Sequence, residues 1–321
     1  MFARSDIEAA FAIVRGILPP TTQQRWPLLD ARVGARVWVK HENHTAVGAF
    51  KVRGGLVYFD ALRRREPGLR GVISATRGNH GQSVAFAARR YGLAAAIVVP
   101  HGNSPEKNAA MRALGAELVE HGEDFQAARE HAARWAAERS LHYVPSYHDD
   151  LVRGVASYWI ECFGAIPAEQ MPEAVFVPIG LGSGICACAA VRAHLSLSTR
   201  IIGVVSAHAT AYQQSFRAGH AVESAATTQL ADGVACRTPD TQALAVIRRE
   251  VDDVIAVSDE EVAAAMRLLF ATTHNVAEGA GAVGLAGLWQ QRERWRGRSV
   301  ATVLSGGNVD SDVFARVLAG A

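Results

Sequence analysis

Short apolar runs alternate along this chain with longer stretches whose apolar residues recur at helical spacing. Short runs rich in β-branched residues are typical of buried strands, and the longer stretches are typical of amphipathic helices. The strands are predicted at Val37–Lys40, Val72–Ala75, Ala95–Val99, Val175–Pro178, Ile201–Val205, Val254–Val257 and Val300–Leu304. The helices between them are predicted at His80–Tyr91, Pro105–Leu114, Phe125–Glu138, Asp259–Thr272 and Ala280–Arg292. Strands that alternate with helices build mainly parallel, twisted sheets flanked by helices, so the predicted fold class is α/β.

The chain opens with a predicted helix. Ser5 and Glu8 have the spacing of a capping box, and apolar residues follow at helical spacing, namely Ile7, Phe11, Val14 and Leu18. Pro19 and Pro20 should end this helix, because proline cannot continue its hydrogen-bond ladder. The sequence has no internal repeat and no Pro/Gly-rich linker, so we expect any division into domains to come from topology.

Ligands of open α/β sheets bind at the carboxyl ends of the strands, so the turns that follow strands are the places where chemistry is expected. The first is the lysine turn, Gly48-Ala-Phe-Lys-Val-Arg-Gly-Gly55, which opens a predicted helix. The amine of Lys51 can form a Schiff base with an aldehyde cofactor and can act as a base. The alternative is an exposed lysine on a helix surface, the usual place of this residue.

The second is the asparagine turn, Thr76-Arg-Gly-Asn-His-Gly-Gln82. Backbone N–H groups at the start of a helix bind anions such as a carboxylate. Asn79 could donate a hydrogen bond to a phenolic oxygen of a cofactor. The alternative is a plain strand-to-helix turn with asparagine as its cap.

The third is the glycine turn, Gly180-Leu-Gly-Ser-Gly184, which opens an apolar helix. Glycines let the backbone approach a phosphate, which the N–H groups and the helix dipole then hold. The same spacing also occurs in dinucleotide sites, and those need an acidic residue at the end of the next strand. Ser206-Ala207-His208 stand there instead, so a single phosphate is favoured over NAD.

The fourth is the serine turn, Ser305-Gly-Gly-Asn308, directly after the last predicted strand. The hydroxyl of Ser305 could hydrogen-bond a ring nitrogen of a cofactor. The alternative is a tight turn or a cap, because serine, glycine and asparagine are the usual turn residues.

Composition narrows the class of protein further. The chain has 321 residues and a net charge of +2, from 33 basic and 31 acidic residues, which gives no argument for a nucleic-acid partner. Neither a signal peptide nor an apolar run of the ~20 residues that span a bilayer is visible, so a cytoplasmic protein without membrane contact is expected. The four cysteines have no metal-type spacing and are expected to be reduced and buried.

The ordered turns resemble those of the fold type II pyridoxal-phosphate enzymes, in the branch of serine/threonine dehydratases and serine racemases. The resemblance runs over nearly the whole chain. The matching phrases are Gly48–Gly54, Gly78–Gln82, Gly180–Gly184, Ala231–Val234, Glu278–Gly281 and Ser305–Val309.

This resemblance implies a two-domain fold of the tryptophan synthase β type. Residues 1–70 and 148–321 would form a large cofactor-binding domain, and residues 71–147 a small mobile α/β domain. The implied cofactor is pyridoxal 5'-phosphate, with Lys51 and Ser305 as catalytic residues. The other implied cofactor-binding residues are Phe50, Asn79, Gly180, Leu181, Gly182, Ser183, Gly184 and Glu278. The implied substrate-binding residues are Thr76, Arg77, Gly78, Asn79 and His80.

Relatives are commonly dimers, so a homodimer is expected. Because the chain ends soon after Ser305, we expect none of the regulatory domains that biosynthetic threonine dehydratases carry. Arg77 stands where racemases have a serine base, and a guanidinium is a poor base, so racemisation is disfavoured. Val205 and Ala211 stand where several relatives bind a divalent cation, so no metal is expected. His80 stands where cysteine-synthase relatives favour threonine, which counts against sulfur β-replacement.

The resemblance implies β-elimination from a β-hydroxy-amino acid, with L-threonine and L-serine as the expected substrates and a 2-oxo acid and ammonia as products. Lys51 would remove the Cα proton, and the neutral Ser305 would favour elimination over transamination. Arg77 could bind a second carboxylate, as in 3-hydroxyaspartate, or stack on an aromatic substituent as in phenylserine; alternatively it points to solvent.

Other functions stay open from the sequence alone. They are an amino-acid racemase or a β-replacement enzyme of the same family, an NAD-dependent oxidoreductase, and a binding protein that keeps the fold without catalysis. The intact Lys51 speaks against the last of these. His41, His44 and His274 either line the site or pack in the core.

Overall fold

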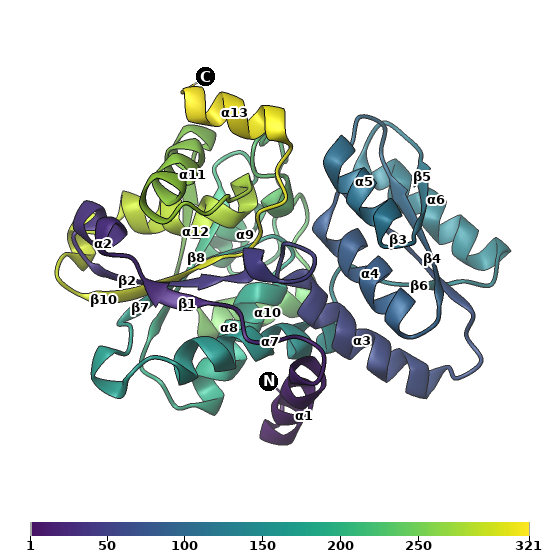
Figure 1. The fold of residues 1–321 in the computed structure, drawn as a ribbon, viewed down its shortest axis with the longest axis horizontal. Coiled ribbons are helices and arrows are strands. Elements are labelled where there is room, and N and C mark those ends of the chain that lie inside the picture. Colours follow the sequence, from purple (N-terminus) through teal and green to yellow (C-terminus); the bar gives the residue numbers. More distant parts are fainter. Residues whose placement is uncertain (1, 321) are drawn as a thin grey trace.

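The computed structural model describes residues 2–320 and contains two sheets with helices around each (Figure 1). One sheet has six strands in the order β1-β2-β10-β7-β8-β9, and only β1 runs antiparallel to its neighbour. These strands are β1 (Gln23–Arg25), β2 (Arg36–His41), β7 (Ala174–Pro178), β8 (Arg200–Ser206), β9 (Asp253–Val257) and β10 (Ser299–Leu304). The predicted α/β fold class is therefore confirmed.

The second sheet has four parallel strands in the order β5-β4-β3-β6. They are β3 (Gly71–Ala75), β4 (Ala94–Val99), β5 (Glu117–Glu120) and β6 (His142–Tyr143). We call this sheet with helices α4, α5 and α6 the small lobe, and the remainder the large lobe. The helices of the small lobe are α4 (Asn79–Arg90), α5 (Pro105–Ala113) and α6 (Phe125–Glu138). The exact limits of the two expected domains stay a prediction.

The large lobe holds the other helices, and α3 lies between the two lobes, packed on both α4 and α7 (Figure 1). They are α1 (Arg4–Arg15), α2 (Pro27–Val33), α3 (Lys51–Arg65), α7 (Asp149–Gly164), α8 (Ser183–His194), α9 (Ala211–Ala218), α10 (Thr241–Glu250), α11 (Asp259–Thr273), α12 (Gly279–Gln290) and α13 (Ser311–Ala319). Short 3-10 helices are η1 (Glu42–His44), η2 (Ala168–Gln170), η3 (Asp232–Val234) and η4 (Arg292–Trp295). No helix within residues 2–320 is both long and apolar enough to cross a membrane.

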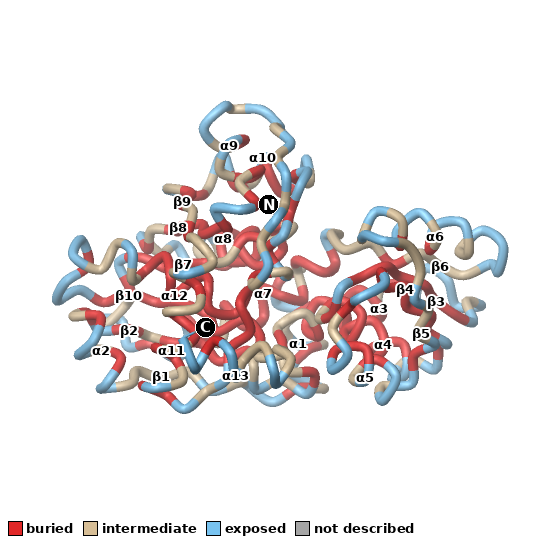
Figure 2. The backbone as a smooth tube through the Cα atoms, turned by 90° about the horizontal axis from the view of Figure 1, so that it is seen from above, coloured by how far each residue is buried: buried red, intermediate tan, exposed pale blue. Residues whose placement is uncertain are grey.

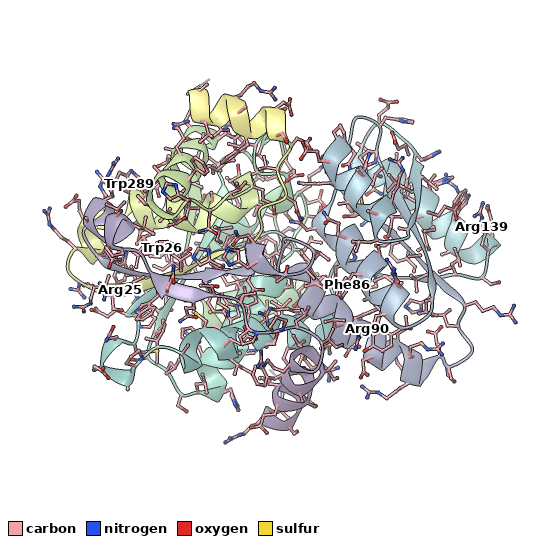
Figure 3. All side chains as sticks on the ribbon, viewed as in Figure 1. Arg25, Trp26, Phe86, Arg90, Arg139 and Trp289 are labelled. Carbon is pink, nitrogen blue, oxygen red and sulfur yellow. The ribbon has the colours of Figure 1, made fainter. Side chains whose placement is uncertain are left out.

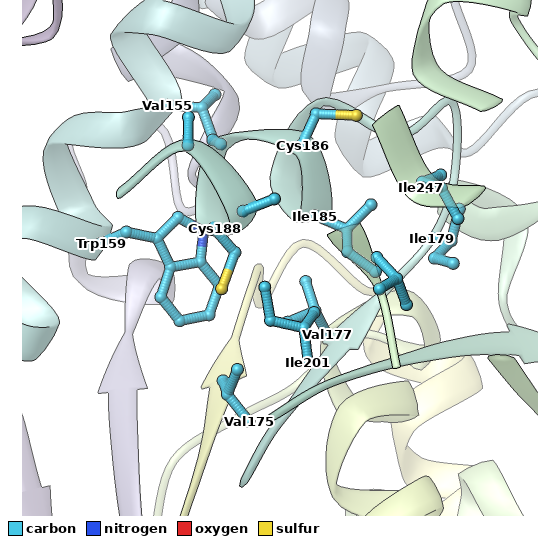
Figure 4. Packing of buried hydrophobic residues seen from close by; sticks show 14 of the residues in the cluster. Val155, Trp159, Val175, Val177, Ile179, Ile185, Cys186, Cys188, Ile201 and Ile247 are labelled. Carbon is cyan, nitrogen blue, oxygen red and sulfur yellow. The ribbon is translucent and has the colours of Figure 1, made fainter. Parts of the chain in front are cut away.

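The strands of both sheets form the buried layer of each lobe, and exposed backbone lies in the outer helices and loops (Figure 2). In the large lobe, Trp159 and Cys188 pack over Val175, Val177 and Ile201 (Figure 4). Between the lobes, Phe86 of α4 packs against a cluster from α1 and α3 (Figure 3). The four cysteines lie in the described part of the chain, and all are free and buried, as expected.

Three details of the prediction were wrong or incomplete. The capping box of Ser5 and Glu8 does not form, because the helix begins at Arg4 and the carboxylate of Asp6 accepts the N–H of Ala3 (3.2 Å). The helix also ends at Arg15, before Leu18 and the two prolines. Strands β1, β5 and β6 escaped prediction because they are short and only partly buried or exposed, so they lack an apolar run.

Candidate active site

The carboxyl ends of β2, β10 and β7 meet at one edge of the large sheet and bring three of the predicted turns together. Strand β10 lies between the other two, with Leu304 opposite His41 and Thr302 opposite Phe176. The lysine turn leaves β2 through η1, the serine turn leaves β10, and the glycine turn leaves β7. The asparagine turn comes from β3 of the small lobe and faces them.

The lysine turn and the serine turn are joined by backbone hydrogen bonds. The N–H of Phe50 donates to the carbonyl of Ser305 (3.0 Å), and the N–H of Gly307 donates to the carbonyl of Gly48 (2.9 Å). Gly48 has a φ of 68°, and a Cβ there would lie 2.5 Å from Oδ1 of Asn308. Glycine is needed here because both the backbone angle and the close contact exclude a side chain.

Lys51 is the first residue of α3, and its surroundings favour the neutral amine. Burial lowers the pKa of Lys51 to about 8, although the carboxylate of Glu278 opposes this shift. The ring of Phe50 lies 5.1 Å from Nζ. The hydroxyl of Ser83 donates to the carbonyl of Lys51 (2.7 Å) and ties the start of α3 to α4. An amine with this pKa can take up and release a proton near neutral pH.

Asn79 begins α4 and connects three of the predicted site regions. Its Nδ2 donates to Oε1 of Glu278 (2.5 Å), and its Oδ1 accepts from Nδ2 of Asn308 in the serine turn (2.8 Å). Both hydrogen bonds fix the orientation of the amide. The hydroxyl of Thr76, at the end of β3, accepts from the N–H of Gly78 (3.0 Å) and shapes the asparagine turn.

Two residues of the asparagine turn, His80 and Arg77, differ in exposure. His80 is buried, and its Nε2 has no hydrogen-bond partner within residues 2–320. Burial, and then the nearby Lys51, lower the pKa of His80 to about 3, so the imidazole is neutral near pH 7. Arg77 is exposed, and it makes no hydrogen bond or ion pair to the described residues. The structure therefore brings His80 to Lys51 but leaves Arg77 open to solvent.

The glycine turn leaves its N–H groups available because side chains of the core hold its carbonyls. The indole of Trp159 donates to the carbonyl of Gly184 (2.9 Å), and the hydroxyl of Tyr212 donates to that of Leu181 (2.9 Å). No side chain of residues 2–320 caps α8, whose N-cap is Gly182 with a φ of 100°. A Cβ on Gly180 would lie 2.5 Å from the carbonyl oxygen of Gly233. This uncapped glycine cradle fits a phosphate group.

Ser305 is buried at the end of β10, and its hydroxyl lies 3.4 Å from the carbonyl of Ala280, too long for a strong hydrogen bond. It is thus available to a ligand. Ser183, in the glycine turn, is also buried. Together with Lys51, Asn79 and the glycine cradle, these groups fit an aldehyde cofactor that carries a phosphate and a ring nitrogen.

Three polar residues that the sequence did not single out as site residues belong to this centre. Asn308 orients Asn79, as described above. Lys107 of α5 forms ion pairs with Asp232 (Nζ to Oδ2, 2.8 Å) and with Glu278 (Nζ to Oε2, 3.3 Å). Its side chain is only 8% exposed.

A compositional signal could have indicated Lys107. Only three of the chain's 33 lysines and arginines are lysines, and they stand at positions 40, 51 and 107. All the others are arginine, and among them Arg53 is also buried. Lys40 and Lys107 are buried in ion pairs and Lys51 lies in the site, so each of the three lysines stands at an enclosed position.

Fold and site together define an enzyme class that binds pyridoxal phosphate. The chain belongs to the pyridoxal-phosphate dependent enzyme family, whose sequence model matches residues 14–306. The L-threonine ammonia-lyase of Geobacter sulfurreducens is 36% identical over 290 residues, which are 89% of this chain and 71% of that protein. The L-threo-3-hydroxyaspartate ammonia-lyase of Saccharomyces cerevisiae is 32% identical over 294 residues, 91% of this chain and 89% of that protein.

The structural comparison agrees with the sequence comparison. The processed form of threonine deaminase isoform 2 from Solanum lycopersicum superimposes with a TM-score of 0.90 and 28% identity, over 99% of this chain and 94% of that chain. This chain is thus similar to ammonia-lyases in both sequence and fold.

Proposed function

We propose that this enzyme eliminates water and ammonia from a β-hydroxy-amino acid, with L-threonine or L-serine as substrate. The observation that carries the proposal is the amine of Lys51, whose pKa is lowered to about 8 by burial and which lies beside the neutral Ser305 turn. The similarity to L-threonine ammonia-lyases supports it. The net products are a 2-oxo acid and ammonia, and the water lost from the β-carbon is regained when the released enamine hydrolyses.

Each turn has a role in this reaction. The N–H groups of the glycine turn would hold the cofactor phosphate, Asn79 would contact the ring substituent, and Ser305 would face the ring nitrogen. The N–H groups of the asparagine turn hold the substrate carboxylate. Lys51, as the neutral amine, takes the proton from the substrate's Cα. Pyridoxal phosphate, when bound, supplies the electron sink that makes this proton acidic enough to remove.

Ser305 explains why elimination is favoured. A hydroxyl is neutral, whereas an aspartate at this place would favour a protonated ring nitrogen. Ser305 would leave that nitrogen unprotonated, which would favour loss of the β-hydroxyl over transamination. His80 is neutral and buried beside Lys51, so it adds no positive charge that would compete with the N–H groups of the asparagine turn for the substrate carboxylate.

The test is ammonia release from the protein loaded with pyridoxal phosphate. The panel consists of L- and D-serine, L- and D-threonine, both 3-hydroxyaspartate diastereomers and phenylserine, with Lys51→Ala as control. Release that the control lacks establishes elimination and names the substrate group. No release, from a protein that still binds the cofactor, would refute the proposal. Chiral analysis of the recovered substrate tests racemisation, and added thiols test β-replacement.

A second candidate substrate is 3-hydroxyaspartate. Arg77 is exposed beside the asparagine turn and has no carboxylate partner among residues 2–320. A guanidinium in this position can pair with a second carboxylate of the substrate. The similarity to the yeast L-threo-3-hydroxyaspartate ammonia-lyase supports this candidate. Arg77→Ala should then lower kcat/KM for 3-hydroxyaspartate more than for threonine; an unchanged ranking of substrates would rule it out.

We also propose that the enzyme is a cytoplasmic homodimer and that the small lobe, residues 71–147, moves as a unit. The four free, buried cysteines support a reducing compartment. Light scattering of the purified protein tests the dimer.

A further inference from the structure

Among the ion pairs of residues 2–320, only that of Lys107 with Glu278 joins a buried charge of one lobe to a buried charge of the other. Its ammonium leaves the start of α5 in the small lobe and lies between two carboxylates of the large lobe, Asp232 of η3 and Glu278 at the N-cap of α12. The stem of Lys107 covers Gly78, where a Cβ would lie 2.5 Å from its Cδ. The asparagine turn therefore has Lys107 packed directly against it.

Glu278 is the acceptor that connects Lys107 to the cofactor site. Its side chain is 3% exposed; Oε2 faces Lys107 and Oε1 accepts from Asn79. A hydrogen bond to an ionised carboxylate is about twice as strong as one to a neutral group. The orientation of Asn79 thus depends on the charge of Glu278.

The pKa of Glu278 is raised overall, so its charge depends on the groups that oppose burial. Burial raises the pKa of Glu278, the Lys107 ammonium and the Asn79 amide oppose this, and the Asp232 carboxylate adds to it. The titratable groups that face Glu278 are Lys107, Asp232 and, across the site, Lys51. The two carboxylates outweigh burial at Lys107 and raise its pKa, so Lys107 stays charged.

We propose that Lys107 is a positioning residue, which brings a positive charge from the small lobe to Glu278, keeps that carboxylate ionised and thereby holds Asn79 in its cofactor-binding orientation. The proposal rests on the proposed function only where catalysis is the readout. The packing of the Lys107 stem against Gly78 supports it, because this contact fixes where the ammonium lies between the two carboxylates.

A second set of contacts holds the start of α5 without touching Glu278 and supplies a control. Asp310 accepts from the hydroxyl of Ser104 (2.6 Å) and the N–H of Glu106 (3.3 Å). Glu106 in turn accepts from the N–H (2.8 Å) and the hydroxyl (2.6 Å) of Ser311. The starts of α5 and α13 therefore cap each other across the lobes (Figure 1).

The experiment compares four variants: Lys107→Met, Lys107→Arg, Asp232→Asn and Ser311→Ala, of which the last removes a hydroxyl that bonds Glu106 but not Lys107. For each, the dissociation constant of pyridoxal phosphate from the apoprotein is measured by absorbance between about pH 5.5 and 9, and kcat and KM follow in the loaded enzyme. Circular dichroism verifies that each variant is folded.

Lys107→Met removes the charge that keeps Glu278 ionised. The affinity of this variant for pyridoxal phosphate should therefore fall about tenfold at acidic pH and recover as the pH rises. Asp232→Asn removes a negative charge beside Glu278. The loss of cofactor affinity at acidic pH should therefore occur at a lower pH than in the wild type. Lys107→Arg keeps the charge, so the pH at which cofactor affinity is lost should stay that of the wild type. Ser311→Ala should leave the pH profile unchanged.

Opposite shifts in Lys107→Met and Asp232→Asn establish the positioning role, because a merely structural contact would not produce them. Shifts in the same direction, or a Ser311→Ala profile that matches Lys107→Met, would overturn it. If Lys107→Met does not fold, the Asp232→Asn shift decides alone. If no variant or wild type releases ammonia, the proposed function fails, while the affinity profiles still decide the role of Lys107.

Discussion

Replacing Arg53 with methionine should lower the free energy of unfolding by about 3–5 kcal/mol, the usual cost of removing one partner from a buried ion pair. Arg53 lies two residues after Lys51 on α3, and its side chain is 0% exposed. Because a protein of ordinary stability has only about 5–15 kcal/mol in total, the variant should unfold at clearly lower denaturant concentration.

The magnitude follows from the groups that the substitution leaves behind. Arg53 donates to Glu42 (2.7 and 3.1 Å) and to Glu161 (2.9 and 2.8 Å). Without Arg53, Glu161 keeps the ammonium of Lys40 (2.7 Å), but Glu42 keeps only the hydroxyl of Thr21 (2.6 Å). One buried carboxylate thus loses its cation, which places the cost in the range of a broken pair.

The assay is urea unfolding followed by tryptophan fluorescence, with Glu42→Gln in the Arg53→Met background as the matched variant. Removing the stranded charge should recover about 1–2 kcal/mol. A loss below about 1 kcal/mol in Arg53→Met, the level of a surface pair, would refute the reasoning, as would a double variant less stable than the single one.

The pH dependence of this effect has a definite sign. Burial would raise the pKa of Glu161, but Arg53 and Lys40 together lower it. A lowered carboxyl pKa stabilises the fold above the unfolded-state value of about 4.3, and this stabilisation is lost as the pH falls through the folded-state value. The stability difference between wild type and Arg53→Met should therefore be largest near neutral pH and narrow below about pH 4.3.

Other predictions address the site. Acetylation of the apoprotein, followed by mass spectrometry, should label Lys51 with a midpoint near pH 8 because burial lowers its pKa to about 8, whereas a midpoint above pH 10 would contradict this. Ser305→Asp should increase transamination relative to ammonia release, measured as the product ratio; an unchanged ratio would contradict the role of the neutral hydroxyl. Gly180→Ala should weaken pyridoxal-phosphate binding at least about tenfold, since its Cβ would meet the carbonyl of Gly233 at 2.5 Å and move the phosphate cradle. Equal affinity in an equilibrium titration would show that the cradle lies elsewhere.

The sequence by itself determined the α/β class and the strands that carry the site. Parallel strands such as β3 and β10 are buried along their whole length and are mostly apolar, so a short apolar run in the sequence reveals them. The glycine, asparagine, lysine and serine turns were also visible, because a turn after a strand combines residues that are neighbours in the chain. Local patterns therefore predicted Lys51, Asn79 and Ser305 as candidates.

Only the tertiary structure decided which distant groups hold these candidates in place. Lys107 and Asp232 are 125 residues apart, and Asn79 and Glu278 are 199 apart, so no local spacing connects them. Their pairing depends on burial, which makes an unpaired charge so costly that folding must bring a partner to it. The same applies to Trp159, which holds Gly184 from another helix, and to the burial that lowers the pKa of Lys51. Local sequence thus identifies the reactive groups, and their burial in the folded protein determines their charge.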